Sequence, residues 1–243
     1  MGATAPLRFL SGVLRSVLWF AQTSLSLSRS PLSGDEAGNF DHIYASRLSE
    51  GFRKYLNLRY EIFHEERLTA AQPCVYVVNH RSNLDVITLS RVFPLNTIVI
   101  GKKEVLRAPL FGTIFERGGN IAIDRKNSDN ARAGFARAER AIVEMGRSIW
   151  VFPEGTRNHG RPLLPFRKGA FHLARNAGVP VVPIVCAVPD GWVSGRRMFL
   201  ARETTVRIEV LEPIASDGFD SVDDFVKQAH DAMSEALVRL SAG

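Results

Sequence analysis

The chain has 243 residues, 45% of them hydrophobic and 23% charged, which is ordinary for a globular protein with one core. Its two cysteines, Cys74 and Cys186, lie in apolar, strand-like runs and predict buried, inert thiols, so the sequence excludes a disulfide framework and a cysteine-based zinc site. The net charge of +6 and the sequence pI of about 9.7 favour an anionic partner: nucleic acid, a phosphorylated substrate or an anionic membrane surface.

Residues 7 to 28 predict an amphipathic helix. Arg15 interrupts its apolar stretch and no small-x-small cleavage site follows, so the segment differs from a secretory signal. Its uninterrupted apolar core is too short to span a bilayer. At 100° per residue its polar and apolar side chains separate, which is typical of a helix in a membrane interface, with Trp19 at headgroup depth. The alternative is a helix that packs on the protein's own core. The polar side holds Arg8, Ser11, Gly12, Arg15 and Gln22, and the apolar side holds Leu10, Val13, Leu14, Val17, Leu18 and Phe20.

A second amphipathic helix is expected over Phe40 to Leu56, after a linker at residues 29 to 38. The two helices can pair as an N-terminal hairpin. We therefore expect residues 1 to 57 to form a membrane-associating helical unit and residues 58 to 243 to form an α/β domain. This arrangement predicts a peripheral or monotopic protein on the cytoplasmic side of a membrane.

Beyond residue 58, strands and helices alternate without a long-period repeat. This pattern predicts a layered αβα domain with a mostly parallel or mixed central sheet. The alternating pattern of Thr205 to Leu211 is typical of an edge strand. Other strands are expected at Tyr60–His64, Val75–Val78, Thr97–Gly101, Asn120–Ile123, Ser148–Phe152 and Val179–Val188; helices are expected at Val86–Val92, Ala131–Met145, Gly169–Asn176 with Gly178 at its end, and Asp223–Leu240.

The central stretch of the sequence is a buried strand followed at once by polar residues. Val75 to Val78 is apolar, and Asn79 to Asn83 are all polar. In open α/β sheets ligands bind at the carboxyl ends of the strands. His80 and Asp85 can meet only if the histidine lies in the turn and the aspartate on the first turn of the next helix. The carboxylate would then hold one ring nitrogen and leave the other as a base. The alternative is a solvated turn beside a carboxylate that the helix dipole favours.

Three further strands end in charged groups. They end in Lys102-Lys103-Glu104, in Asp124-Arg125 and in Glu154-Gly155-Thr156-Arg157. If the strands are parallel neighbours, these groups converge on one edge of the sheet. A His/Asp pair that faces several cations and a glycine turn suits a base acting on a hydroxyl near a phosphate.

Four sequence blocks between residues 73 and 188 resemble the PlsC-type glycerolipid acyltransferases, a membrane-associated family typified by 1-acyl-sn-glycerol-3-phosphate acyltransferase. The first block is His80-x4-Asp85. The second runs from Gly101 through Pro109 and Gly112 to Arg125. The third runs from Phe152 to Arg157 and is followed by Phe166 to Ala170, and the fourth is Val179 to Ile184. The blocks occur in the same order as in that family.

The resemblance implies a reaction and a role for each residue. His80 would deprotonate the free hydroxyl of a lysophospholipid acceptor, giving phosphatidic acid from 1-acyl-sn-glycerol 3-phosphate, and Asp85 would orient its ring. The acyl donor would be acyl-CoA or acyl carrier protein, without an acyl-enzyme, a metal or a cofactor. The implied phosphate-binding residues are Glu154, Gly155, Thr156 and Arg157, with Arg125 and Lys103 as second choices and Lys102 as a substitute for Lys103.

Other functions fit parts of the same pattern. The four blocks do not separate 1-acyl-sn-glycerol 3-phosphate from lyso-ornithine lipid, another lysophospholipid or an acylated sugar lipid as acceptor. A non-catalytic lipid- or phosphate-binding protein would keep the His/Asp pair only for structure. Nucleic-acid binding is not favoured, because the sequence has no helix-turn-helix, zinc-finger or aromatic RNA-binding signature.

Overall fold

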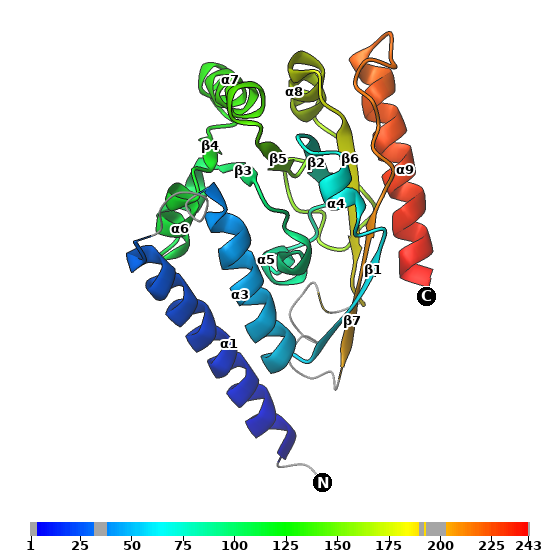
Figure 1. Cartoon of the computed structure of the whole chain (residues 1–243). Coiled ribbons are helices and arrows are strands. Elements are labelled where there is room, and N and C mark those ends of the chain that lie inside the picture. The colour runs from blue at the N-terminus through cyan, green and yellow to red at the C-terminus, as the bar shows by residue number, and fades with distance from the viewer. Residues whose placement is uncertain (1–3, 32–37, 190–191, 193–202, 243) are drawn as a thin grey trace.

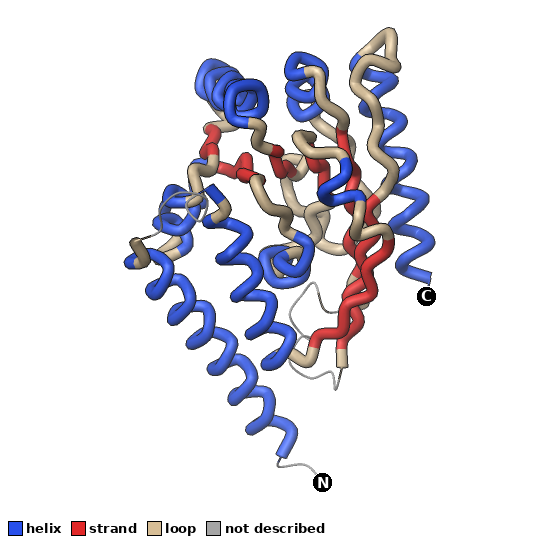
Figure 2. The backbone as a smooth tube through the Cα atoms, viewed as in Figure 1, coloured by secondary structure: helices blue, strands red, loops and turns tan. Residues whose placement is uncertain are grey.

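The computed structural model describes residues 4–31, 38–189, 192 and 203–242, and its middle layer is one sheet (Figures 1 and 2). The strands are β1 (Leu58–Phe63), β2 (Val75–Val78), β3 (Thr97–Lys102), β4 (Ile121–Ile123), β5 (Ser148–Val151), β6 (Val181–Ala187) and β7 (Thr204–Val210). Their order across the sheet is β1-β7-β6-β2-β5-β3-β4. Every neighbouring pair is parallel except β6 and β7, which run antiparallel. The predicted layered α/β fold with a mixed sheet is therefore confirmed.

Helices cover both faces of this sheet, and each face has its own apolar core (Figure 1). Successive strand residues point to opposite faces, so Val75 and Val77 enter one core while Tyr76 and Val78 enter the other. One face carries α7 (Ser128–Met145), α8 (Gly169–Ala177) and α9 (Val222–Ala242). The other carries α3 (Phe40–Tyr55), α5 (Asp85–Thr88) and α6 (Phe111–Arg117), with α4 (Arg67–Ala70) beside it and 3₁₀ turns at Ser90–Val92 and Lys103–Arg107.

The helix α1 (Thr4–Arg29) runs antiparallel to α3 on the outside of the molecule, which confirms the predicted hairpin (Figure 1). The indole of Trp19 donates to the carbonyl of Arg47 at 3.1 Å, and the hydroxyls of Ser24 and Tyr44 are 3.0 Å apart. Trp19 therefore packs between the two helices instead of facing outward as expected, because a helical wheel gives a direction but not a neighbour. The linker expected from residue 29 begins one residue later, and residues 32–37 of it lie outside the described part.

The outward side of α1 carries large apolar side chains among polar ones. Leu14, Val17 and Leu18 are 58%, 58% and 56% exposed, and Leu25 is 39% exposed. By contrast, α3 buries Phe40, Tyr44, Leu48 and Phe52 against the sheet. Within the described part of residues 1–57, the large apolar side chains that are exposed thus lie on α1 and not on α3. None of the described helices is both long enough and apolar enough to cross a bilayer.

Two expected elements differ from the structure. The strand β7 is not at an edge, because β1 pairs with it on one side and β6 on the other. Its alternation reflects one buried and one half-exposed face, which an interior strand can also have. The single helix expected over Val86–Val92 is split into α5 and a 3₁₀ turn. The predicted end of α8 is confirmed, since Gly178 adopts the left-handed conformation, with φ of 66°.

Candidate active site

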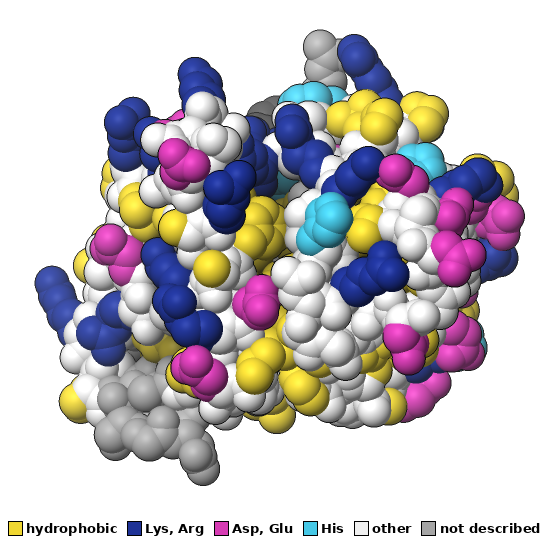
Figure 3. All heavy atoms as spheres, turned by 90° about the horizontal axis from the view of Figure 1, so that it is seen from above, with side chains coloured by type: hydrophobic (Ala, Val, Ile, Leu, Met, Phe, Trp, Pro, Cys, Tyr) yellow, Lys and Arg dark blue, Asp and Glu magenta, His cyan; other side chains and the backbone are white. Residues whose placement is uncertain are grey.

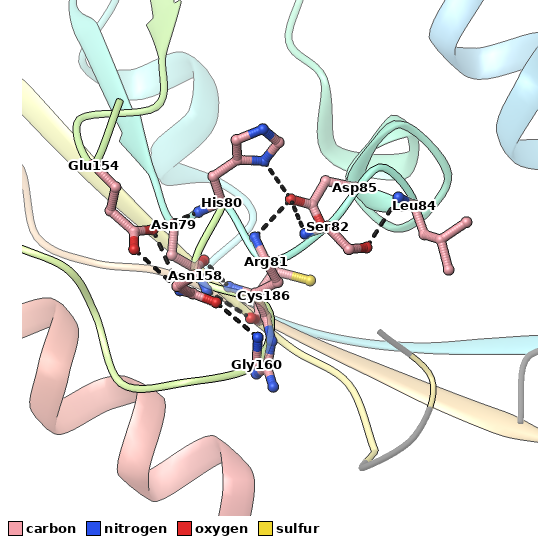
Figure 4. A network of polar contacts seen from close by, with 10 residues as sticks. All are labelled: Asn79, His80, Arg81, Ser82, Leu84, Asp85, Glu154, Asn158, Gly160 and Cys186. Carbon is pink, nitrogen blue, oxygen red and sulfur yellow. Dashed lines mark hydrogen bonds and ion pairs between the residues drawn. The ribbon is translucent and has the colours of Figure 1, made fainter. Parts of the chain in front are cut away.

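The loop after β2 and the start of α5 bring His80 and Asp85 together (Figure 4). The histidine Nδ1 lies 2.6 Å from Asp85 Oδ2. The same oxygen accepts the backbone N–H groups of Arg81 at 2.8 Å and Ser82 at 3.1 Å. Because an ionised carboxylate only accepts hydrogen bonds, this contact assigns the proton to Nδ1 and leaves the other ring nitrogen free to accept one.

The ring of His80 is held in place on a second side as well. It stacks on Phe152, with centroids 4.1 Å apart and planes inclined by 20°. The side chain is 20% exposed, and its free nitrogen points away from Asp85 (Figure 4). His80 also lines a cavity beneath the helices of the α3 face. The free nitrogen is therefore accessible to a ligand while the ring has a fixed orientation, as a general base requires.

Glu154 follows β5 and points into the protein instead of toward solvent (Figure 4). It is only 4% exposed. Its Oε1 accepts the backbone N–H of His80 at 2.7 Å, and its Oε2 accepts that of Leu164 at 3.0 Å. The amide of Asn158 donates to Oε2 at 3.1 Å. Both carboxylate oxygens are thus bonded to the protein's own N–H groups.

Gly155 makes the turn that follows. Its φ of 72° is strained for any other L-residue, and an added Cβ would lie 2.5 Å from Arg167 Nε. Its carbonyl accepts a hydrogen bond from the Arg125 guanidinium. This turn places the next two residues, Thr156 and Arg157, on the wall of the cavity that His80 lines.

Three cations face this cavity: Lys102, Arg125 and Arg157. Partial burial lowers the pKa of Lys102, and the positive charges of Arg125 and Arg157 lower it further. Burial also lowers the pKa of Arg125, with a further contribution from Arg167. Such mutual repulsion favours the binding of an anion among these groups.

Lys103, the preferred lysine of the sequence prediction, does not line the cavity. Its side chain is 48% exposed, and its ammonium pairs with Asp124. Lys102, expected only as its substitute, lies on the cavity wall. The sequence does not indicate which of two adjacent lysines at the end of a strand faces the cavity, because their directions depend on the 3₁₀ segment that begins at Lys103.

The cavity has a volume of about 570 Å³ and passes between β3 and the helices of the α3 face. Its mouth holds the polar groups at the carboxyl ends of the strands. Toward the amino ends its wall includes Asp41 and Asn120, which precedes β4. Most of the wall between is apolar, with Phe20, Leu48, Leu89, Val99, Phe111 and Trp150 among its side chains. A long apolar group can occupy this space while its polar end stays near His80.

Sequence reasoning missed Asn158, and it did not predict that Phe152, the first residue of the third block, stacks on His80. It placed the cysteines correctly, since both are buried. Burial raises the pKa of Cys74 to about 11 and that of Cys186 to about 12. Neither thiol is therefore available as a thiolate nucleophile near neutral pH.

The surface charge is uneven. On the face in Figure 3, Lys and Arg side chains spread over the left and middle, whereas acidic side chains gather at the right edge. In Figure 1 this edge corresponds to the side of β1, β7 and α9. On this face the basic side chains are thus more widely spread than the acidic ones.

Comparisons with known proteins agree with this geometry. The family model named Acyltransferase matches residues 59–187, more than half of the chain. The chain is 39% identical over 168 residues to 1-acyl-sn-glycerol-3-phosphate acyltransferase of Haemophilus influenzae, covering 68% of this chain and 69% of the relative. It is 31% identical over 235 residues to the Escherichia coli protein of the same name, covering 96% and 93%.

A similar fold occurs in the crystal structure of the 1-acyl-sn-glycerophosphate acyltransferase PlsC from Thermotoga maritima. The TM-score is 0.68 at 19% sequence identity, with 98% of this chain and 96% of the other covered. At this identity the likeness concerns the fold, including the N-terminal helices.

Proposed function

Because the chain belongs to the acyltransferase family that includes the 1-acyl-sn-glycerol-3-phosphate acyltransferases, we propose that it acylates 1-acyl-sn-glycerol 3-phosphate. The acyl group would come from a thioester, and the product would be phosphatidic acid. The observation that carries this proposal is the His80–Asp85 pair at the mouth of an apolar cavity, beside Arg157.

The mechanism that this geometry supports is general base catalysis. The free nitrogen of His80 takes the proton from the acceptor hydroxyl as the oxygen attacks the thioester carbonyl. Asp85 stabilises the imidazolium through the 2.6 Å contact with Nδ1. The tetrahedral intermediate then expels the thiolate by breaking the C–S bond, and the imidazolium returns the proton to sulfur. No covalent enzyme intermediate is needed.

The acceptor's phosphate is assigned to the cations of the cavity mouth. Arg157 can offer two parallel N–H groups, and Lys102 and Arg125 add positive charge on the same wall. Thr156 supplies a hydroxyl beside them, and the Gly155 turn allows the backbone to approach the ligand closely. Lys103 is not included, because its ammonium pairs with Asp124.

The apolar cavity is assigned to an acyl chain. Acyl-CoA and acyl carrier protein would present the same thioester to His80, and both remain part of the proposal as donors. The outward leucines and valine of α1 would rest in the interface of an anionic membrane, on its cytoplasmic side.

A panel of lysolipid acceptors, assayed with both kinds of donor, tests the proposal. We expect phosphatidic acid from 1-acyl-sn-glycerol 3-phosphate and a loss of at least ~10²–10⁴-fold in turnover for His80→Ala. Wild-type turnover by that variant would refute the mechanism. Preferred acylation of another lysolipid would refute the acceptor, and the absence of any acyl product would refute the activity.

A further inference from the structure

The loop after β5 is joined to the loop after β2 by a short ladder of hydrogen bonds. Glu154 Oε1 accepts the N–H of His80, and the carbonyl of His80 accepts the N–H of Asn158 at 2.8 Å. One residue further along each loop, the N–H of His159 donates to the carbonyl of Arg81 at 3.0 Å. Both backbone polar groups of His80 are thus bonded to the segment that carries Arg157.

Glu154 is surrounded by backbone and side-chain N–H groups that join two loops. It is nearly fully buried, and its two oxygens receive N–H groups from His80, Leu164 and Asn158. Within the described residues it forms no salt bridge. A phosphate placed against this carboxylate would meet a second negative charge in a poorly solvated place, which is unfavourable.

We propose that Glu154 is a positioning residue, which fixes the backbone of His80 and does not contact the acceptor phosphate. This inference rests on the proposed function, because it concerns the same base and the same acceptor. It also means that Arg157 and His80 belong to one hydrogen-bonded unit, so the distance between phosphate and base is set by the fold.

Two sets of contacts determine the position of the His80 imidazole. Asp85 and Phe152 restrain the ring, whereas Glu154 and Asn158 restrain the main chain that carries it. Removing the acceptor of the His80 N–H leaves a donor without its partner, and the loop must move to satisfy it. A displacement of about 1 Å in a reacting group can cost roughly 10²-fold in rate.

Glu154→Gln tests this role, since glutamine keeps the length but replaces one acceptor oxygen by a donor group. We expect kcat to fall by about 10- to 100-fold while KM for 1-acyl-sn-glycerol 3-phosphate changes by less than about threefold. The matched control is Glu144→Gln, which makes the same chemical change at an exposed position of α7. A rise in acceptor KM with kcat retained would overturn the proposal.

Equilibrium binding separates this inference from the proposed activity. We expect His80→Ala and His80→Ala/Glu154→Gln to bind 1-acyl-sn-glycerol 3-phosphate with the same Kd, because Glu154 holds the main chain of residue 80 and does not contact the lipid. A weaker Kd in the double variant would show direct contact with the acceptor. If the wild-type protein binds this lipid but forms no product with either donor, the proposed function fails.

Asn158→Ala provides a second variant in case Glu154→Gln does not fold. It removes the amide that donates to Glu154 and leaves the carboxylate in place. We expect the same division of effects, with a smaller fall in kcat and an unchanged acceptor KM. An unchanged kcat in a folded Asn158→Ala protein would overturn the proposal.

Discussion

Asp85 and Asp41 line opposite ends of the same cavity and are bonded in very different ways. One oxygen of Asp85 receives the His80 ring and two backbone N–H groups. Asp41 accepts one hydrogen bond, from the amide of Asn120 at 3.1 Å, and its buried Oδ2 has no partner. Burial raises the pKa of Asp41 to about 7, although Asn120 and the positive charge of Arg147 act in the opposite direction.

This difference shows where the protein uses its polar groups. At the mouth of the cavity each buried carboxylate is held in one orientation by several donors, and the cations Lys102 and Arg157 are exposed. At the inner end a carboxyl group is enclosed by α3 and the end of α6, with one oxygen unsatisfied. The mouth has the fixed geometry that catalysis requires, whereas the inner end carries a cost in stability.

The largest effect is expected from a change at Asp85, the carboxylate that accepts several hydrogen bonds. Asp85→Asn places an amide against the histidine, and the amide group can impose the other tautomer, so we expect kcat to fall by up to roughly 10⁴-fold, as for the equivalent change in a serine protease triad. Initial rates at saturating acceptor measure the effect. Asp231→Asn on the exposed face of α9 is the control. A fall of less than tenfold would show that Asp85 does not fix the ring.

The exposed cations at the mouth should give the next largest effect. Arg157→Ala removes a charged donor from the wall of the cavity, and a hydrogen bond to a charged group is worth about 1.5–3 kcal/mol. We therefore expect acceptor KM to rise by about 10- to 100-fold with a smaller change in kcat. Arg161→Ala, four residues further along the same loop, serves as the control. An unchanged acceptor KM would remove Arg157 from the phosphate site.

Asp41→Asn tests the carboxyl group that has a single hydrogen bond, through the pH dependence of the free energy of unfolding. Below about pH 4 the carboxyl is protonated in both the folded and the unfolded chain. As the pH rises toward 7, the unfolded chain ionises and the folded one does not, so the wild-type protein loses stability. Arg147 is the cation that faces the group, and Asn120 and Gly118 are the neutral neighbours.

Asparagine does not titrate, so we expect the variant's advantage to grow between about pH 4 and pH 7 and then to stay constant. Urea unfolding at pH 5 and pH 8.5 should show a difference between variant and wild type that is larger at the higher pH by on the order of 1–3 kcal/mol. The same difference at both pH values would mean that Asp41 is ionised throughout.

The smallest effect is expected from the exposed apolar side chains of α1. Leu18→Ser removes one exposed leucine from α1 and should weaken binding to anionic liposomes by about tenfold, given ~1.5–3 kcal/mol for a fully buried side chain. Val143→Ser is the control, because Val143 is 65% exposed but lies on α7. Sedimentation with liposomes measures the difference. Equal binding by both variants would place the membrane contact elsewhere.

The sequence predicts the parts of this structure that depend on local pattern. The apolar run Val75–Val78 followed by polar residues places His80 at the carboxyl end of a buried strand, and Gly178 predicts a helix end. Convergence of the strand ends follows from parallel pairing, which the alternation of strands and helices implies. Asp85 is also predictable, because it begins the helix that follows the loop holding His80.

Contacts between distant segments could not be predicted in the same way. Glu154 is separated from His80 by 74 residues, and nothing near it distinguishes an inward carboxylate from a phosphate-binding one. The position of Trp19 depends on Gly51, where the absence of a side chain leaves room for the indole. The interior place of β7 depends on which strand pairs beside it, and alternation reports only burial of one face.

The position of α1 has a consequence for how a lipid could reach the base. Phe20 lies on the cavity wall and stacks on Phe111, whereas Leu18, two residues earlier, faces outward. The helix α1 therefore carries apolar side chains both on the outside of the protein and on the wall of the cavity. The acyl tail of a lipid that moves past α1 would pass from one apolar surface to another without entering water.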